Sequence, residues 1–395
     1  MKKQMLDTIT RRDFLKLAAM TGTTLGLESV LGCATTQVPM QDIAASLAAI
    51  KPEQVVYPKL PGNKVQAPEN GCLVGFRKVY VPENDPVFIG KQKDMAGRAK
   101  NIDDYVTIAN KERVMESIDI KGLITKNIQL YEQAFGAKPA IYVISDTPRL
   151  YLDFPEREAE AVASNSVIPY INAAPGSVML AKLRFGLDDI LSGKRDTHLK
   201  KFAEGAKKFG ERFGGFFMTT MVESNADWNY WGQSAKFIPT WQHIWQVFED
   251  NGANQYATWV WELYCPEGAG KRAVHPDNMY PGDKYIDWIG LSAFSRQRYH
   301  SSSTLGELAG NTSDQMHKNH RNKPIMQAEF AVTNNSSQPR WLMDAFKTIK
   351  SKPSIKAAIY WDNVTAHEQD DHTLSDRSLQ ALKEIFKDPY WIMAK

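Results

Sequence analysis

Residues 215–232 read GFFMTTMVESNADWNYWG, and this stretch changes character near its middle. Its first part, residues 216–222, is apolar or β-branched at both alternating faces, which is typical of a strand buried on both sides of a parallel sheet. Its second part begins with Glu223 and brings Asn, Asp and two Trp residues within nine positions. The stretch therefore predicts a buried strand that ends in a polar and aromatic segment.

The same alternation of short apolar runs with amphipathic segments repeats along the chain. The predicted strands are 71–76, 140–144, 166–171, 216–222, 256–263, 286–291, 324–330 and 355–361. The predicted helices are 120–135, 154–163, 196–209, 238–250, 305–317, 341–349 and 378–386. This order favours a (β/α)8 TIM barrel, with an open doubly wound sheet as the alternative. The barrel is favoured because polar and aromatic residues follow strands throughout the series rather than at one switch point.

The N-terminus has the features of an export signal. Residues 10–16, TRRDFLK, resemble a twin-arginine motif, and the mildly apolar stretch after them is too short and too polar to span a bilayer. Residues 30–33, VLGC, resemble a lipobox, so we expect Cys33 to carry a lipid after cleavage. An ordinary cleavable signal peptide with an incidental cysteine is the alternative. We expect a twin-arginine lipoprotein, anchored to a membrane and facing the periplasm or the cell surface.

The chain divides into three predicted parts. Residues 1–32 form the signal peptide, the proline-rich residues 33–69 form a tether, and residues 70–395 form the barrel domain. The formal net charge of +3 leaves no basic stripe for nucleic acid. Cys72 and Cys265 lack metal-binding spacing, and no nucleotide-binding motif occurs, so we expect no metal and no cofactor. We also expect a monomer.

A second carboxylate follows a second apolar strand. Glu329 lies near the end of the predicted strand 324–330, as Glu223 follows strand 216–222. Burying a carboxylate without a role or a partner is costly. Two glutamates that face each other across a barrel mouth, roughly 5–5.5 Å apart, suit a retaining glycosidase, and tryptophan faces hold sugar rings. The predicted catalytic pair is therefore Glu223 and Glu329.

Several segments resemble glycoside hydrolase family 26, of the clan A barrels, and the resemblance covers most of residues 70–395. The matching segments are 189–196, Val222 to Asn225 with Trp228 and Trp231, 280–291, 323–329 and 359–363. The resemblance implies that Glu223 is the acid/base and Glu329 the nucleophile. It implies an endo-glycosidase acting on a β-linked polysaccharide, with β-1,4-mannan as the first expectation. A β-glucan hydrolase and a non-catalytic surface glycan-binding lipoprotein are the alternatives.

Two positions depart from the pattern of the family. Val222 stands where the family has His before the acid/base, and residues 292–294 read SAF where an aromatic hydroxyl often follows strand six. Both departures affect the subsite around the cleaved bond, so the substrate differs from mannan or turnover is slower. The loop 368–372 could bind a cation, but a solvated loop is the better interpretation. The predicted substrate-binding residues are Asn225, Trp228, Trp231, Trp261, Phe294 and Trp361.

Overall fold

The computed structural model describes residues 45–78, 94–112 apart from 96, 119–144, 153–175, 185–296, 303–365 and 370–394. The predicted signal peptide and Cys33 lie outside these residues. So does His367, one of the loop histidines after strand eight. Within the described residues, no helix is long and apolar enough to cross a membrane.

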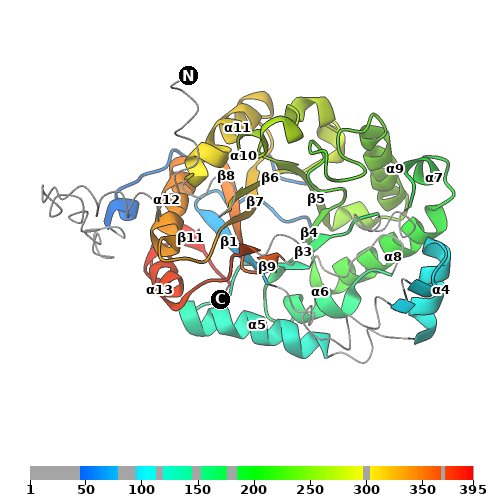
Figure 1. Ribbon diagram of the computed structural model, residues 1–395, viewed down its shortest axis with the longest axis horizontal. Helices are drawn as coiled ribbons and strands as arrows, with labels where there is room; N and C mark the ends of the chain where they lie inside the picture. Colours follow the sequence, from blue (N-terminus) through cyan, green and yellow to red (C-terminus); the bar gives the residue numbers. More distant parts are fainter. Residues whose placement is uncertain are drawn as a thin grey trace, which may run out of the picture. The chain divides into compact units, whose positions relative to one another are not determined.

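Eight parallel strands close into a barrel at the centre of the domain (Figure 1). The barrel closes because β1 pairs in parallel with β8, with Leu73 opposite Ala357. The strands are β1 (Cys72–Arg77), β2 (Ile141–Ile144), β3 (Ile168–Asn172), β4 (Phe216–Thr219), β5 (Ala257–Tyr264), β6 (Trp288–Ser295), β7 (Ile325–Val332) and β8 (Ile355–Trp361). A short strand, β11 (Trp391–Ile392), adds to β1, and β9 (Val364–Thr365) forms a hairpin with β10 (Asp370–Asp371). The predicted (β/α)8 barrel is confirmed.

Helices surround the barrel and follow the strands in chain order (Figure 1). They are α4 (Ile102–Glu112), α5 (Ile120–Phe135), α6 (Glu156–Ala163), α7 (Leu187–Leu191), α8 (Asp196–Phe213), α9 (Phe237–Asp250), α10 (Pro266–Ala269), α11 (Leu305–Asn319), α12 (Gln338–Ser351) and α13 (Asp376–Ile385). Side chains cap the starts of some of them: α11 begins with a capping box between Thr304 and Glu307, and Ser375 caps α13. All seven predicted helices occur, with bounds within a few residues of those predicted.

The fourth strand is shorter than we predicted. It ends at Thr219 instead of Val222. Beyond it, Met221 and Glu223 have φ angles of 51° and 52°, in the left-handed region that non-glycine residues rarely adopt. The chain therefore leaves the sheet in a tight loop, and Glu223 lies on that loop and not on the strand.

The N-terminal end of the barrel is filled with apolar side chains. Phe217 and Trp288 meet edge to face at 5.1 Å between ring centroids, within a cluster of inward-facing residues from all the strands. Leu60, Val65 and Ala67, which precede β1, are partly buried and pack against this cluster. Because apolar residues fill this end, the polar inward-facing residues of the barrel are left at its C-terminal end.

Part of the predicted tether packs on the barrel. The segment 51–69 contains no helix or named strand, as expected, but Lys64 pairs with Asp287 at 2.8 Å and the Val65 amide donates to Thr258 Oγ1 at 2.8 Å. The Tyr57 hydroxyl donates to the Ser354 carbonyl at 3.3 Å. The folded domain therefore begins before residue 70, the boundary that we set from the sequence.

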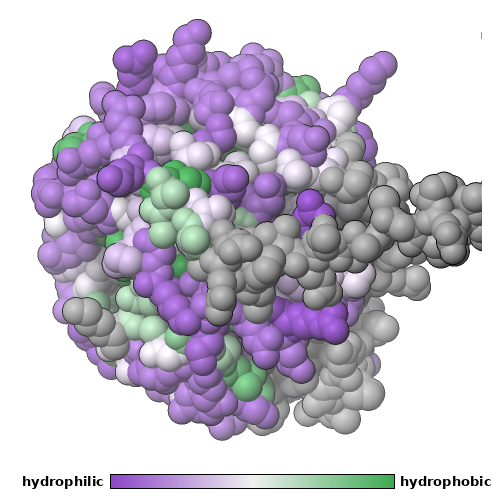
Figure 2. Space-filling model, turned by 90° about the vertical axis from the view of Figure 1, so that its left-hand side faces the viewer, coloured by the Kyte–Doolittle hydropathy of each residue, from purple (hydrophilic) through white to green (hydrophobic). Residues whose placement is uncertain are grey.

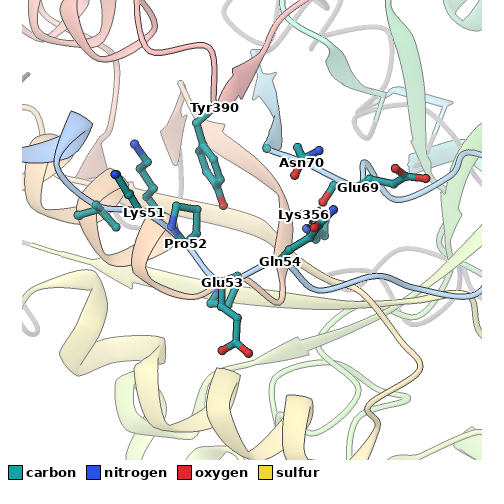
Figure 3. A pocket seen from close by; sticks show the side chains of 12 residues that line it. Lys51, Pro52, Glu53, Gln54, Glu69, Asn70, Lys356 and Tyr390 are labelled. Carbon is teal, nitrogen blue, oxygen red and sulfur yellow. Dashed lines mark hydrogen bonds between the residues drawn. The ribbon is translucent and has the colours of Figure 1, made fainter.

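A cavity of about 310 Å³ lies between this segment and the N-terminal end of the barrel. Figure 3 shows Tyr390 and Lys356 beside the extended residues Pro52 to Gln54. Figure 2 shows one outer face of the molecule, which is mostly hydrophilic, with hydrophobic residues in small separate areas. The cavity is not lined by either predicted catalytic residue, Glu223 or Glu329.

Candidate active site

A bulge in β7 turns Glu329 into the barrel. Leu291 of β6 pairs with Gln327, but the next residue, Ser292, pairs with Glu329, so Ala328 is an extra residue on β7. The bulge lets Ala328 belong to the inner core while Glu329 also faces inward, against the alternation of a regular strand. Glu329 is 6% exposed. The sheet thus fixes the direction of this carboxylate.

An arginine neutralises Glu329. Arg77, the last residue of β1, forms an ion pair with the Glu329 carboxylate through its guanidinium group. The same guanidinium lies 3.6 Å from the centroid of the Trp361 ring, at the end of β8. Both ion-pair partners are largely buried, so this pairing offsets the cost of placing a charge there. The ion pair favours the charged form of the Glu329 carboxylate, and the bulged strand fixes its position.

Glu223 has a different setting. It is partly exposed, and its carboxylate accepts a hydrogen bond from the Trp228 indole N–H. Desolvation and, second, the charge of Glu329 raise the pKa of Glu223, while the hydrogen bond from Trp228 and the charges of Arg296 and Arg77 lower it; the net result is a pKa of about 7. The influence of Glu329 indicates that the two carboxyl groups lie close together at the mouth. Near neutral pH, Glu223 can therefore either give or take a proton.

Buried polar contacts hold the loop that carries Glu223. Asn225 is fully buried, accepts from the Tyr264 amide at 2.9 Å and donates to the Tyr264 carbonyl at 2.8 Å. Trp231 is 1% exposed and donates to the Val222 carbonyl at 2.8 Å. We predicted both as substrate-binding residues, and this was wrong for direct contact. They hold the loop in its left-handed conformation and leave no surface for a sugar.

Two further predicted contacts need correction. Trp261 is fully buried and packs against Tyr280 and His320 outside the strand barrel, because residue 261 alternates with the inward-facing residue 262. Phe294 is 3% exposed and packs edge to face against Trp361 at 5.4 Å. Trp261 is a core residue, and Phe294 supports Trp361 from behind.

Trp228 and Trp361 are the two predicted aromatic residues that keep exposed surface at the mouth. Trp228 lies beside Glu223, and Trp361 lies beside the Arg77–Glu329 pair. One face of Trp361 is covered by the guanidinium of Arg77, so only the rest of its ring is open to a ligand. The structure thus brings the two glutamates and two aromatic rings to one end of the barrel.

The sequence analysis missed a third carboxylate, Glu262 on β5. It is 1% exposed and lies on the inner side of the barrel, where it accepts hydrogen bonds from Tyr170 and Ser292. A signal was present in the sequence, because Glu262 is the one charged residue in the buried strand ATWVWELY. On that strand we had singled out only Trp261, as a substrate-binding residue.

Among the described residues, no group of three or more His, Cys, Asp or Glu side chains forms a metal site. The described part of the loop after β8 includes Asp371, which accepts from the amide and hydroxyl of Thr373 at 2.8 and 2.6 Å. Cys72 and Cys265 are both buried free thiols.

Similarity to curated proteins is limited to part of the chain. No family model matches it. β-1,3-Xylanases from a Vibrio species and an Alcaligenes species are 24% and 23% identical to it over 173 residues, which is 42% of this chain. The match spans 35% of the length of each of these curated relatives.

Solved structures match most of the chain. A family 26 domain of an endo-β-mannanase/endo-β-glucanase from Prevotella bryantii has a TM-score of 0.52 and 14% identity, covering 82% of this chain and 91% of that one. A mannanase from Bacillus subtilis also has a TM-score of 0.52, with 16% identity and coverage of 85% and 96%. A β-mannanase from a symbiotic protist of the termite Reticulitermes speratus, complexed with gluco-manno-oligosaccharide, also has a TM-score of 0.52. It is 12% identical, and the match covers 87% of this chain and 98% of that one. The chain therefore has the (β/α)8 barrel fold found in these glycoside hydrolase family 26 mannanases.

Proposed function

We propose that this protein is a retaining endo-glycosidase of family 26 that hydrolyses a β-linked polysaccharide. The observation that carries the proposal is the unequal setting of two neighbouring carboxyl groups. Glu329 is paired with Arg77, while burial and the charge of Glu329 raise the pKa of Glu223 to about 7. One group is suited to be an ionised nucleophile, and the other is suited to be a proton donor.

The reaction proceeds in two displacements. The Glu329 carboxylate attacks the anomeric carbon as the glycosidic C–O bond breaks, and Glu223 gives its proton to the leaving oxygen. Glu223 is then ionised and takes a proton from water. The oxygen of that water attacks the anomeric carbon, breaks the ester to Glu329 and returns Glu223 to its protonated form. Two inversions leave the anomeric configuration unchanged.

The substrate class follows from the proteins that this chain resembles. β-1,4-Mannan is the first candidate, because the structural neighbours are named as mannanases. The curated relatives favour β-1,3-xylan as a second candidate, since their matched segments carry higher identity. A mixed-linkage or other β-glucan stays a third. All three are neutral β-glycans that can bind against Trp228 and Trp361.

The experiment is hydrolysis of a substrate panel followed by proton NMR. Mannan, glucomannan, lichenan, β-1,4-xylan and β-1,3-xylan are incubated with the protein, and new reducing ends are measured. The anomer of the first product is then read by NMR before mutarotation. We expect β-anomeric product from at least one substrate. An α-anomeric first product would exclude Glu329 as a nucleophile, and binding without turnover on every substrate would favour a glycan-binding lipoprotein instead.

We also propose export by the twin-arginine route and anchoring through a lipid on Cys33. The support is the twin-arginine motif at residues 10–16 and the lipobox-like residues 30–33. Cys33→Ser is expected to move the protein from the membrane fraction to the soluble fraction and to abolish palmitate labelling. Unchanged membrane partition of this variant would remove the anchor from the proposal.

A further inference from the structure

Glu262 occupies a place that the barrel keeps open for it. The neighbouring strand has Gly290 opposite Glu262, and a Cβ atom at Gly290 would lie 3.2 Å from Glu262 Cγ and 2.9 Å from Val260 Cγ1. Any larger residue at 290 would therefore crowd the stem of the glutamate. Gly290 lets a buried carboxyl group fit inside the barrel, directly above the apolar layer that contains Val260.

The carboxyl group of Glu262 is bound by hydroxyl groups. Tyr170 of β3 donates to Oε2 at 2.7 Å, and Ser292 of β6 donates to Oε1 at 2.9 Å. Within the described residues, no ion pair within 4.0 Å links Glu262 to a cation. Each oxygen thus has one neutral donor, and two such bonds favour the ionised form. Burial opposes ionisation more strongly than the hydrogen bonds favour it, so the pKa of Glu262 is raised to about 7.

Glu262 is linked to both proposed catalytic groups. Its carbonyl accepts from the amide of Ser224, the residue after Glu223, at 3.4 Å. Its partner Ser292 pairs in the sheet with Glu329. The charged groups that act on Glu262 come from two other elements: Glu223 after β4 and Arg77 on β1. Glu329 on β7 acts on Tyr170, the hydrogen-bond partner of Glu262. Those that act on Glu223 are Glu329, Arg296 and Arg77.

We propose that Glu262 is a positioning residue for the acid/base, and that repulsion between its carboxyl group and that of Glu223 keeps a proton on this pair at neutral pH. This inference rests on the proposed role of Glu223. The charge of Glu223 raises the pKa of Glu262, and electrostatic repulsion is mutual, so an ionised Glu262 also disfavours ionisation of Glu223. The two hydroxyl donors favour the ionised form of Glu262, so part of the charge of the pair rests on Glu262 while Glu223 keeps its proton.

The test is Glu262→Gln, which keeps the shape of the side chain and removes its charge. The alkaline limb of the kcat/KM profile, which reports loss of the Glu223 proton, is expected to move to lower pH by about 0.5–1 unit. Glu267→Gln is the matched control, since Glu267 also accepts from a hydroxyl, that of Thr312, but outside the barrel interior. It is expected to leave the profile unchanged.

A second readout does not require turnover. Carboxyl carbons of glutamate are labelled with ¹³C, and the titration of Glu223 is followed in the wild type and in Glu262→Gln, with Glu223→Gln to assign the signal. Tyr170→Phe removes one donor and is expected to shift Glu223 in the same direction by less, so it serves if Glu262→Gln does not fold. An unchanged or raised pKa of Glu223 in the folded variants would overturn the inference. Failure of the wild type to hydrolyse any glycan would instead count against the proposed function.

Discussion

The two proposed catalytic glutamates are held by opposite means. Glu329 lies inside a strand, turned inward by a bulge and paired with Arg77. Glu223 lies four residues beyond Thr219, the last residue of β4, on a loop where its φ angle is 52°, and it accepts one hydrogen bond from the Trp228 indole N–H. A nucleophile needs a fixed position and a constant charge, whereas an acid/base must change charge in each step. The sheet supplies the first condition, and the loop with its neutral partner supplies the second.

The largest expected effect comes from removing Glu329, the glutamate that the strand holds in place. Glu329→Ala is expected to lower kcat by about 10⁴-fold or more, because no covalent intermediate can form. The folded variant is expected to bind oligosaccharide still, which isothermal titration calorimetry would measure. Full activity of this variant would show that the β7 carboxylate is structural and that the chemistry lies elsewhere.

Removing Glu223, the glutamate on the loop, is expected to cause a different kind of defect from removing Glu329. Glu223→Ala is expected to lower the rate on polysaccharide by about 10²–10⁴-fold, because it removes general acid–base catalysis. Activated aryl glycosides need no protonation of the leaving group, so they are expected to lose less. Azide is expected to restore part of the rate and to yield a β-glycosyl azide, detectable by mass spectrometry. Equal losses on both substrates, without azide rescue, would contradict the assignment of Glu223.

The same contrast explains what the sequence could and could not predict. Apolar runs and amphipathic segments depend on local pattern, so the eight strands, the helices and the barrel were predicted correctly. Both glutamates could be proposed as candidates from the sequence because each follows an apolar run. The β7 bulge was not predicted, because it depends on Ala328 being left without a partner on β6, which leaves no mark in the residue pattern.

The substrate-binding residues were predicted less well for a related reason. Aromatic residues near strand ends can face the mouth or the helices, and the face depends on where the strand ends. Trp261 alternates with Glu262, so one of the two had to face inward, and we chose the aromatic one. Asn225 and Trp231 are polar or aromatic in the right place, but the tight loop after Thr219 buries them.

Breaking the ion pair between Arg77 and Glu329 is expected to have an intermediate effect. Arg77→Met removes the cation and leaves the buried Glu329 without it, which is expected to cost about 3–5 kcal/mol of unfolding free energy. Because the ionised form of Glu329 is then disfavoured, the acid limb of the kcat/KM profile is expected to move to higher pH. Urea unfolding and a pH–rate profile measure the two effects. A stable variant with an unchanged acid limb would show that Arg77 is dispensable.

The smallest expected effect comes from removing the hydrogen bond that Trp228 donates to Glu223. Trp228→Phe keeps an aromatic ring but removes the indole N–H, the contact that lowers the pKa of Glu223. The pKa of Glu223 is therefore expected to rise above its value of about 7. The proton stays on Glu223 to higher pH, so the alkaline limb moves upward by about 1 unit, since a hydrogen bond to a charged group contributes about 1.5 kcal/mol. This shift is opposite in sign to that expected for Glu262→Gln, and the acid limb, which depends on Glu329, is expected to stay in place. A downward shift of the alkaline limb, or movement of both limbs together, would show that Trp228 acts on the site through packing and not through its hydrogen bond to the acid/base.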